Sequence, residues 1–473
     1  MSETISYESL LARIQARDEH SHDVLDPATG DLVGRAPVQD LDALERAIER
    51  ARAAQPGWAA LTDQARRDHL HRAADAVERW AEPLAELLSR EQGKPLDGLN
   101  ARFEVGGCVA WLRAAAETPL PTEVLVDDGA TYAEMQYRPI GVVGAITPWN
   151  WPMMIAIWQI APSLRMGNTV VAKPAQSTDL SGLAIAAVLN TTLPADVLTV
   201  VTGPGRSIGQ ALSSHPSIGK IMFTGSTEVG RQIIEASADN ITRLTLELGG
   251  NDAGIVLPDV DPAAIAEGLF WGAFINTGQT CAALKRLYVH DSVYDAVVEN
   301  LIAFAASVPM GIGLQEGNLL GPLQNRKQYE TVVALVAAAK ESGAQIVLGG
   351  DPDDAAVGHF YPTTLVTDID PHNALVVEEQ FGPALPIIRY SEVEEAIRLA
   401  NELDFGLGAS VWSSDRAKAQ QIAGRLEAGT VWLNSHGGLH PMVPFGGAKQ
   451  SGYGREFGVE GLKAVSEAQV IVG

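Results

Sequence analysis

From about Gly141 onward the chain alternates short apolar runs with helical patterns, and this alternation limits the possible folds more than any other feature. Parallel strands are joined by long crossover connections and are buried on both faces, so they appear as continuous apolar runs. The pattern therefore predicts a parallel sheet covered by helices, an α/β domain of the nucleotide-binding type. The runs are GVVGAIT (141–147), TVVAK (169–173), VLTVVTG (197–203), KIMFTG (220–225) and RLTLELGG (243–250), with helical patterns at 153–165, 179–190, 207–213 and 227–237.

A second alternating series begins near Asp252 and predicts a second α/β domain. Before the first series, apolar residues recur every three or four positions at 41–54 and 65–90, which is typical of amphipathic helices. No linker composition separates the two series, so the boundary is placed near residue 249. The second series contains AGIVL (253–257), RLYVH (286–290), ASVWS (409–413) and TVWLN (430–434), with helical patterns at 261–275, 292–307, 325–341 and 415–426.

The length and charge of the chain indicate how many domains it has and which partners it does not bind. With 473 residues, it is long enough for roughly three domains of about 150 residues, or two large ones. Its 34 basic and 58 acidic residues give a formal net charge of −24. A nucleic acid or an anionic membrane surface would have to bind against this overall field, so neither is expected as a partner.

Cysteine content and the N-terminus indicate a cytoplasmic protein without a metal centre. The chain has only two cysteines, Cys108 and Cys281, too few for a disulfide framework or a structural zinc site. The N-terminal residues lack the basic and then apolar pattern of a signal peptide. The 26 uncharged residues 139–164 are long enough to cross a bilayer, but four prolines and two polar amides interrupt them. A strand, a loop and a helix are predicted there instead.

Two strand-to-helix turns could hold an anion. VTGPGRSIG (201–209) resembles a dinucleotide-binding turn, but its glycines have the spacing GxGxxxG, which is a weak signal. FTGSTEVG (223–230) places Gly225 where the backbone can approach a ligand and Ser226 where a helix N-terminus can bind an anion. The alternative interpretation of Ser226 is a helix N-cap, with Glu228 in the first turn.

Two residues are candidates for covalent and acid–base chemistry. Cys281 lies among small and polar residues in NTGQTCAALKR (276–286), where a substrate could reach a thiol. The alternative is an inert core cysteine, which is the interpretation given to Cys108. Glu247 ends an apolar strand, where burial would raise its pKa toward that of a useful general base. The alternative for Glu247 is an exposed carboxylate at a strand end.

Seven short motifs occur along the chain in this order: PWNWP (148–152), AKP (172–174), FTGSTEVG (223–230), LELGG (246–250), GQTC (278–281), EEQFGP (378–383) and PFGGAKQSGYGRE (444–456). Together they resemble the NAD(P)-dependent aldehyde dehydrogenase superfamily, from about residue 24 to the C-terminus. The separation of Glu247 and Cys281, 281 − 247 = 34, also matches that family. The resemblance implies an α/β fold with three parts: a Rossmann-type cofactor domain (1–118 and 139–248), an α/β catalytic domain (249–445), and a small β oligomerisation arm with the C-terminal segment (119–138 and 446–473).

The resemblance assigns catalytic roles to four residues. It implies that Cys281 attacks the aldehyde carbonyl, and that the side-chain amide of Asn150 and the backbone amide of Cys281 stabilise the oxyanion. After hydride transfer, Glu247 would activate the water that hydrolyses the thioester, with Glu456 as its proton-relay partner. Most relatives have Lys directly after the position of Trp158, whereas this chain has Gln159. The proton relay is therefore a point at which this chain departs from the family.

The resemblance also implies NAD or NADP as the cofactor. Lys173 would lie at the adenosine ribose, Ser226 at the pyrophosphate and Glu379 at the nicotinamide ribose. Gln176 stands where NAD-preferring members commonly have Glu. Its neutral amide removes the repulsion of a 2′-phosphate, so NADP is expected to be tolerated. The other expected cofactor residues are Ile146, Trp149, Gly225 and Phe381.

The expected substrate is an aromatic or bulky apolar aldehyde, because the residues that the resemblance places in the substrate tunnel are large and apolar: Trp151, Met154, Trp158 and Phe445. Succinate-semialdehyde members carry Arg at the position of Trp158, and the segment 434–445 contains neither Arg nor Lys. Such a dehydrogenase, or a cysteine esterase without a redox role, is the alternative. His436 and His440 in this segment have two open interpretations: contact with a phenol or carbonyl of the substrate, or solvation, which is more common for loop histidines. The strand-like segments 132–137 and 467–472 are expected to form an inter-subunit sheet in a homodimer or homotetramer.

Overall fold

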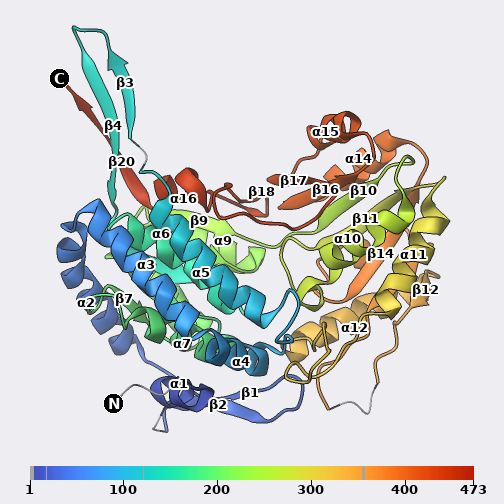
Figure 1. Ribbon diagram of the computed structural model, residues 1–473, viewed down its shortest axis with the longest axis horizontal. Coiled ribbons are helices and arrows are strands. Elements are labelled where there is room, and N and C mark those ends of the chain that lie inside the picture. Colours follow the sequence, from blue (N-terminus) through green and yellow to red (C-terminus); the bar gives the residue numbers. More distant parts are fainter. Residues whose placement is uncertain (1–4, 17–18, 121, 354–356) are drawn as a thin grey trace.

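The computed structural model describes residues 5–16, 19–120, 122–353 and 357–473. Residues 1–4, 17 and 18 of the expected cofactor domain, residue 121 of the expected arm, and residues 354–356 of the expected catalytic domain lie outside the described residues. Two large sheets covered by helices lie next to each other, and a third, narrow sheet projects from the body (Figure 1). The chain begins with α1 (Tyr7–Ile14), β1 (Ser21–Leu25), β2 (Leu32–Pro37), α2 (Leu41–Ala59), α3 (Asp63–Arg79), α4 (Ala81–Gln92) and α5 (Ala101–Glu117).

The helical pattern over 65–90 forms two helices rather than one. Trp80 is the C-cap of α3 and the N-cap of α4, with φ −98° and ψ 14°. A continuous helix would need the N–H of residue 83 to bond to the carbonyl of Arg79, but Pro83 has no N–H and its ring would clash with that carbonyl. Pro83 is tolerated in the first turn of a new helix, so the chain breaks at Trp80.

The first large sheet has the strand order expected of a doubly wound nucleotide-binding fold. From one edge to the other the order is β19, β9, β8, β5, β6, β7, and all neighbours except β19 are parallel. The order reverses between β5 and β8, and ligands of such folds bind outside the carboxyl ends of the strands at that point. The strands are β5 (Val142–Ile146), β6 (Thr169–Lys173), β7 (Leu198–Val200), β8 (Lys220–Thr224), β9 (Arg243–Glu247) and β19 (Gly452–Tyr453).

The helices between these strands agree with the expected ranges, with one exception. The expected helix at 207–213 is a π-helix, Gly205–Gly209, followed by the short α8 (Gln210–Ser214). The uncharged segment 139–164 forms β5, a loop and a helix, as predicted. Among the described residues, no helix is long and apolar enough to cross a membrane. The remaining helices of this part are α6 (Pro152–Arg165), a 3₁₀ turn (Gln176–Thr178), α7 (Asp179–Leu189) and α9 (Thr227–Ser237).

The second large sheet is built from residues 252–433 and is parallel except for its edge strand. Its order is β12, β13, β14, β11, β10, β16, β17, and only β12 is antiparallel to its neighbour. Its strands are β10 (Asp252–Val256), β11 (Leu284–His290), β12 (Gln345–Leu348), β13 (Thr364–Thr367), β14 (Ala384–Tyr390), β16 (Gly408–Trp412) and β17 (Thr430–Leu433). The accompanying helices are α10 (Pro262–Phe274), a 3₁₀ turn (Ile275–Gly278), α11 (Tyr294–Ala306), α12 (Arg326–Glu341), α13 (Ala374–Val377), α14 (Val393–Asn401) and α15 (Arg416–Ala423).

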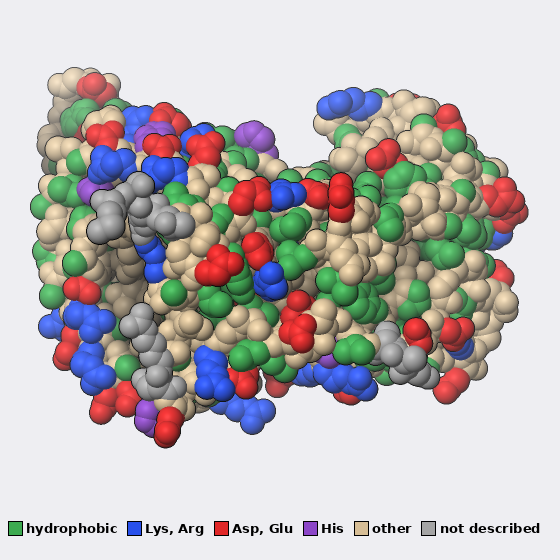
Figure 2. Space-filling model, turned by 60° about the horizontal axis from the view of Figure 1, so that its bottom comes forward, with side chains coloured by type: hydrophobic (Ala, Val, Ile, Leu, Met, Phe, Trp, Pro, Cys, Tyr) green, Lys and Arg blue, Asp and Glu red, His purple; other side chains and the backbone are tan. Residues whose placement is uncertain are grey.

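The narrow third sheet joins the last strand of the chain to a hairpin from its first third. β20 (Ser466–Val472) pairs antiparallel with β4 (Tyr132–Pro139), which pairs with β3 (Glu123–Asp127). These strands extend away from the body, and the C-terminus lies on this projection (Figure 1). On the face drawn in Figure 2, acidic and basic side chains are interspersed over both halves of the molecule. The remaining elements are β15 (Phe405–Gly406), β18 (Ala448–Lys449) and α16 (Gly458–Ala464).

Candidate functional site

A cleft of about 200 Å³ opens at the carboxyl ends of β5, β8 and β9, next to the point where the strand order reverses. Seven of the residues predicted for the cofactor or the chemistry line this cleft, together with others from the same turns. The second large sheet contributes the Cys281 loop and the EEQFGP segment to the opposite wall. The lining residues are Pro148, Trp149, Asn150, Thr224, Gly225, Ser226, Leu248, Gly249, Cys281, Gln328, Glu379 and Phe381.

Cys281 is presented to this cleft by an unusual turn at the end of α10. Asn276, Thr277 and Gly278 have φ angles of 51°, 58° and 76° in succession, all in the left-handed region. A Cβ on Gly278 would lie 2.3 Å from the carbonyl oxygen of Gly382, so only glycine fits there. The turn thus holds the Cys281 loop tightly against the EEQFGP segment, and the thiol is half-buried in the cleft.

The surroundings of Cys281 favour its neutral thiol over the thiolate. Burial raises its pKa to about 12, and the nearby carboxylates, first among them Glu247, act in the same direction. Lys285 opposes them. Its ammonium donates to the carbonyl oxygens of Cys281 at 2.5 Å and Gly250 at 2.9 Å. Lys285 lies in the quoted motif around Cys281, but no pattern in that motif distinguishes it from a surface lysine.

Asn150 lies in the turn between β5 and α6 with its side chain directed to the Cys281 loop. Its Nδ2 donates to the carbonyl oxygen of Gln279 at 2.9 Å, and the second N–H of this amide is available to a ligand in the cleft. Its own backbone carbonyl accepts from Lys94 Nζ at 2.8 Å and from Asn276 Nδ2 at 2.9 Å. The peptide at Asn150 is therefore held from two sides.

Glu247 is a buried carboxylate, and the alternative of an exposed strand end is wrong. Its side chain is 4 % exposed, and neither carboxylate oxygen has a hydrogen-bond partner among the described residues. Burial raises the pKa of Glu247 well above its usual range, the charge of Glu456 raises it further, and Arg455 opposes the shift. An unpaired buried carboxylate is costly to keep for stability alone, which favours a chemical role.

Glu456 belongs to the same buried group as Glu247. Burial raises the pKa of Glu456 to about 8, against the opposing charge of Lys220. Burial also lowers the pKa of Lys220 to about 7, and its Nζ donates to Thr245 Oγ1 at 2.7 Å. Gln159, which replaces the family's lysine, donates from Nε2 to Thr224 Oγ1 at 3.0 Å. Burial thus brings the pKa values of Glu456 and Lys220 close to neutral pH.

Some of the expected cofactor residues line the cleft and others do not. Glu379 Oε1 is 3.1 Å from Lys285 Nζ and accepts from the backbone of Gly250 at 3.2 Å, and Phe381 packs edge-on against Trp149 with ring centroids 5.4 Å apart. Ser226 is the N-cap of α9 and accepts from Val229 at 3.4 Å, so the N-cap interpretation of this residue is confirmed.

The remaining cofactor candidates, Ile146, Lys173 and Gln176, are not among the residues lining this cleft. Lys173 is buried at the end of β6 beside Gly209, with its Nζ donating to the carbonyl of Pro174 at 2.7 Å. The side chain of Gln176 is exposed, and its backbone oxygen lies 3.0 Å from His22 Nε2.

A dinucleotide fits the residues that are present. The open N-terminus of α9 offers backbone N–H groups to a pyrophosphate, and a Cβ on Gly249 would meet Glu379 Oε2 at 2.5 Å, so the backbone of Gly249 leaves the wall of the cleft open. Glu379 supplies a carboxylate for ribose hydroxyls, and Trp149 and Phe381 supply flat apolar surfaces. These groups match the polar and aromatic parts of a nicotinamide dinucleotide.

The four residues predicted for the substrate lie behind the cleft rather than on its lining. Trp158 packs against Phe457 at 4.9 Å and Trp111 at 5.5 Å, and Phe445 stacks on Phe457 at 6.1 Å, measured between ring centroids. Trp158 borders a small cavity of about 20 Å³. The sequence did not single out Trp111 or Phe457, because an aromatic residue in a helix or after a motif has no distinguishing local signal.

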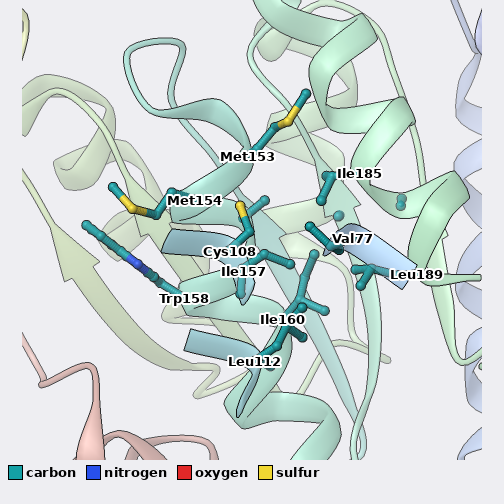
Figure 3. Close-up of a cluster of buried hydrophobic side chains, with 14 of the residues drawn as sticks. Val77, Cys108, Leu112, Met153, Met154, Ile157, Trp158, Ile160, Ile185 and Leu189 are labelled. Atoms are coloured by element: carbon teal, nitrogen blue, oxygen red, sulfur yellow. The ribbon is translucent and has the colours of Figure 1, made fainter. Parts of the chain in front are cut away.

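Figure 3 shows how α6 connects this aromatic group to the core. Met154 and Trp158 lie one helical turn apart at one edge of a buried cluster, and Cys108 lies inside it with Ile157 and Leu112. Burial raises the pKa of Cys108 well above its usual range. Cys108 is therefore an inert core thiol, as expected.

Of the two interpretations of His436, the solvated one is wrong. Its side chain is completely buried, with Nδ1 2.9 Å from Ser410 Oγ and Nε2 3.6 Å from Asp252 Oδ2. The loop folds inward behind the Cys281 segment, where Gly437 approaches the carbonyl of Ala282. His440 is exposed, as expected.

Comparisons with known proteins agree on one family. The sequence profile described as "Aldehyde dehydrogenase family" matches residues 14–471. The chain is 38% identical over 476 residues to phenylacetaldehyde dehydrogenase of Pseudomonas fluorescens, covering 97% of this chain and 94% of that protein. Its fold is similar to that of an NADP-dependent enzyme of E. coli (TM-score 0.94, 35% identity, 97% of this chain and 96% of that chain). It is also similar to betaine aldehyde dehydrogenase of Staphylococcus aureus in complex with NAD+ (TM-score 0.93, 29% identity, 99% and 96%).

Proposed function

Because the chain belongs to the aldehyde dehydrogenase family of NAD(P)-dependent oxidoreductases, we propose that it oxidises an aldehyde to the carboxylic acid through a covalent intermediate on Cys281. One observation carries this proposal. The cleft brings the Cys281 thiol and the Asn150 amide together, and the unpaired carboxylate of Glu247 lies near enough to raise the thiol pKa. Nucleophile, oxyanion donor and base are the three groups that acyl chemistry requires.

The proposed reaction has two halves. Sγ of Cys281 attacks the carbonyl carbon and loses its proton to solvent, and the resulting oxyanion accepts from the free N–H of Asn150 and from the backbone N–H of Cys281. Bound NAD(P) would supply the hydride acceptor, and loss of hydride from the adduct would leave a thioester on Cys281. Glu247 then takes a proton from the water that attacks the thioester, the acid departs, and Sγ is protonated again. Glu456, whose charge acts on Glu247, is the proposed partner that receives this proton.

An aldehyde panel measured at 340 nm with NAD and NADP tests this proposal. We expect aldehyde-dependent reduction of at least one cofactor. Turnover of an ester without nicotinamide, together with a lack of aldehyde oxidation, would favour the cysteine esterase instead.

We further propose that the substrate is aromatic or bulky and apolar. The aromatic group around Trp158 and the name of one relative, phenylacetaldehyde dehydrogenase, support this. An aromatic ring buried against such a wall is stabilised by its lost water-accessible area, about 25 cal/mol per Å². A carboxylate there would lose its hydration without a cationic partner from segment 434–445.

Replacing Trp158 with Arg is expected to raise kcat/KM for succinate semialdehyde relative to benzaldehyde, because it adds a cation where semialdehyde-specific relatives have one. The variant also loses the contacts with Trp111 and Phe457, so its melting temperature should fall. The ratio of the two kcat/KM values does not depend on the folded fraction, and Trp158→Phe is the control without a charge. A wild-type enzyme that prefers succinate semialdehyde over benzaldehyde, hexanal and acetaldehyde would refute the apolar pocket.

For the cofactor, we propose that NADP is accepted because Gln176 carries no charge. Replacing Gln176 with Glu should shift the preference toward NAD by about 1–3 kcal/mol after screening, roughly 5- to 150-fold in the ratio of kcat/KM values. Gln176→Ala, which removes the amide without adding a charge, should leave the ratio near that of the wild type. An unchanged ratio in Gln176→Glu would show that this residue does not contact the ribose.

The third sheet bears on how copies of the chain assemble. We propose that the third sheet is the arm of a homodimer or homotetramer, since its strands expose many apolar residues. The two large sheets support a cofactor domain at 1–118 and 139–248 and a catalytic domain at 249–445, while Gly452 and Tyr453 pair with β9. The two free cysteines support a cytoplasmic location. The exposed apolar residues of the arm are Val124, Leu125, Val126, Val470, Ile471 and Val472.

A further inference from the structure

A completely buried ion pair lies behind the cleft, between Lys94 and Glu104. Neither side chain is exposed, and Lys94 Nζ lies 2.7 Å from Glu104 Oε2. Lys94 follows Gly93, the left-handed C-cap of α4, and Glu104 lies in the first turn of α5. Removing two charges from water is costly, and apolar residues of the same size are often as stable. Stability alone therefore does not account for the pair.

The cation of this pair holds the peptide at Asn150. Lys94 Nζ donates to the backbone carbonyl of Asn150 at 2.8 Å, which also accepts from Asn276 Nδ2 at 2.9 Å. On the other side of the same residue, Asn150 Nδ2 donates to Gln279 at 2.9 Å. The direction of the remaining N–H of this amide is thus set by contacts that begin at Lys94.

The anion of the pair holds the beginning of α6. Glu104 Oε1 accepts from the backbone N–H groups of Met153 at 2.9 Å and Met154 at 3.1 Å. Trp151, the N-cap residue of α6, makes no side-chain cap bond, so a carboxylate from another helix replaces the usual cap. A negative charge also suits the positive end of the helix dipole.

The same cation reaches the nucleophile loop through Trp151. Lys94 Nζ lies 3.6 Å from the centroid of the Trp151 ring, a cation–π contact. Trp151 Nε1 donates to Thr280 Oγ1 at 2.9 Å, and Thr280 directly precedes Cys281. One buried pair therefore contacts both the turn that carries the oxyanion donor and a residue that touches the nucleophile loop.

We propose that Lys94 and Glu104 are positioning residues that fix the turn 150–154 relative to residues 279–281, so that the Asn150 amide meets the oxyanion formed on the Cys281 adduct. The buried carbonyl of Asn150 needs a hydrogen-bond donor, and the buried N–H groups of Met153 and Met154 need an acceptor close to that donor. A lysine paired with a glutamate meets both needs, whereas an apolar pair meets neither. This inference rests on the proposed role of Asn150 in oxyanion stabilisation.

The test removes both charges together, because a single substitution would leave an unpaired buried ion. In Lys94→Met/Glu104→Gln, the rate of the first burst of reduced cofactor should fall by roughly 10- to 100-fold, since a small misplacement of a catalytic group has effects of this size. Alkylation of Cys281 by iodoacetamide forms no oxyanion, so its rate should stay at the wild-type value. The KM for the cofactor should also be unchanged.

Two further variants separate positioning from a general loss of structure. Asp63→Asn removes the partner of Arg165, another buried cation, at the far end of α6. It should lower the melting temperature without slowing the burst. Asn150→Ala alone should slow the burst by roughly 10²- to 10³-fold. If Lys94 and Glu104 act through Asn150, adding their double substitution to Asn150→Ala should change the burst rate little further.

Three results would overturn the inference: a wild-type burst rate in the double variant, an effect that multiplies with that of Asn150→Ala, or an equal loss in Asp63→Asn. If the double variant does not fold, Glu104→Gln alone is decisive. The pKa of Lys94 is lowered by burial to about 8, so its amine can become neutral when Glu104 is neutral. A wild-type enzyme that reduces neither NAD nor NADP with any aldehyde would instead refute the proposed function, on which this inference rests.

Discussion

Replacing Cys281 with Ala is expected to abolish aldehyde oxidation, with a loss of at least about 10⁴-fold in kcat, as is typical when a covalent nucleophile is removed. No other thiol can take its place, because Cys108 is completely buried in α5. The substitution removes one half-buried sulfur atom, so folding and cofactor binding should stay close to those of the wild type.

Steady-state oxidation of benzaldehyde measures the loss of activity, and the fluorescence change on adding NAD(P) measures cofactor binding. Cys108→Ala is the matched control, because it removes the other thiol of the chain from a deeper position. It should lower the melting temperature and keep full activity. Dehydrogenase activity retained in a purified and sequence-verified Cys281→Ala enzyme would exclude this residue as the nucleophile.

Replacing Glu247 with Gln is expected to slow hydrolysis of the thioester by about 10²- to 10⁴-fold, the usual contribution of a general base. Hydride transfer needs no base at this position and should be slowed much less. Stopped-flow traces should then show a rapid burst of reduced cofactor followed by a slow steady state. Equal slowing of hydride transfer and of thioester hydrolysis would contradict the assignment of Glu247 to hydrolysis.

The Glu247→Gln variant should also lose a dependence of the steady-state rate on pH. The pKa of Glu247 is raised well above its usual range by burial, so the carboxyl is protonated at low pH and cannot accept a proton from water. The steady-state rate of the wild type should therefore increase as the pH rises through the raised pKa, and this increase should be absent in Glu247→Gln. Glu235→Gln, at an exposed carboxylate of α9, is the control that should keep the wild-type profile.

The strands of both large sheets are predictable because their signal is local. A run such as 220–225 is apolar at its centre, and the corresponding strand β8 is buried along its whole length. Pro83 is a local sequence signal for the helix break at Trp80, although the regular apolar spacing on both sides of Pro83 favours one continuous helix. The π-helix at Gly205–Gly209 has no comparable signal, since its two glycines permit several backbone conformations.

The residues that meet in the cleft follow from their motifs, but their surroundings do not. Cys281, Asn150 and Glu379 all line the cleft, on turns that follow predicted strands or helices. Lys94, by contrast, contacts a carbonyl 56 positions away in the chain. Nothing in a short window of sequence distinguishes such a lysine from one on the surface. The inward position of His436 likewise depends on Gly437, which lets its loop approach Ala282.

The raised pKa of Cys281 also bears on how the enzyme survives oxidative stress. Peroxides attack thiolates and scarcely attack neutral thiols, and each further oxidation step toward sulfinic acid is hard to reverse. Burial raises the pKa of Cys281 to about 12, which favours the neutral form in the resting enzyme. Damage by hydrogen peroxide should consequently be confined to the brief part of each catalytic cycle in which the sulfur has given up its proton and has not yet bonded to carbon.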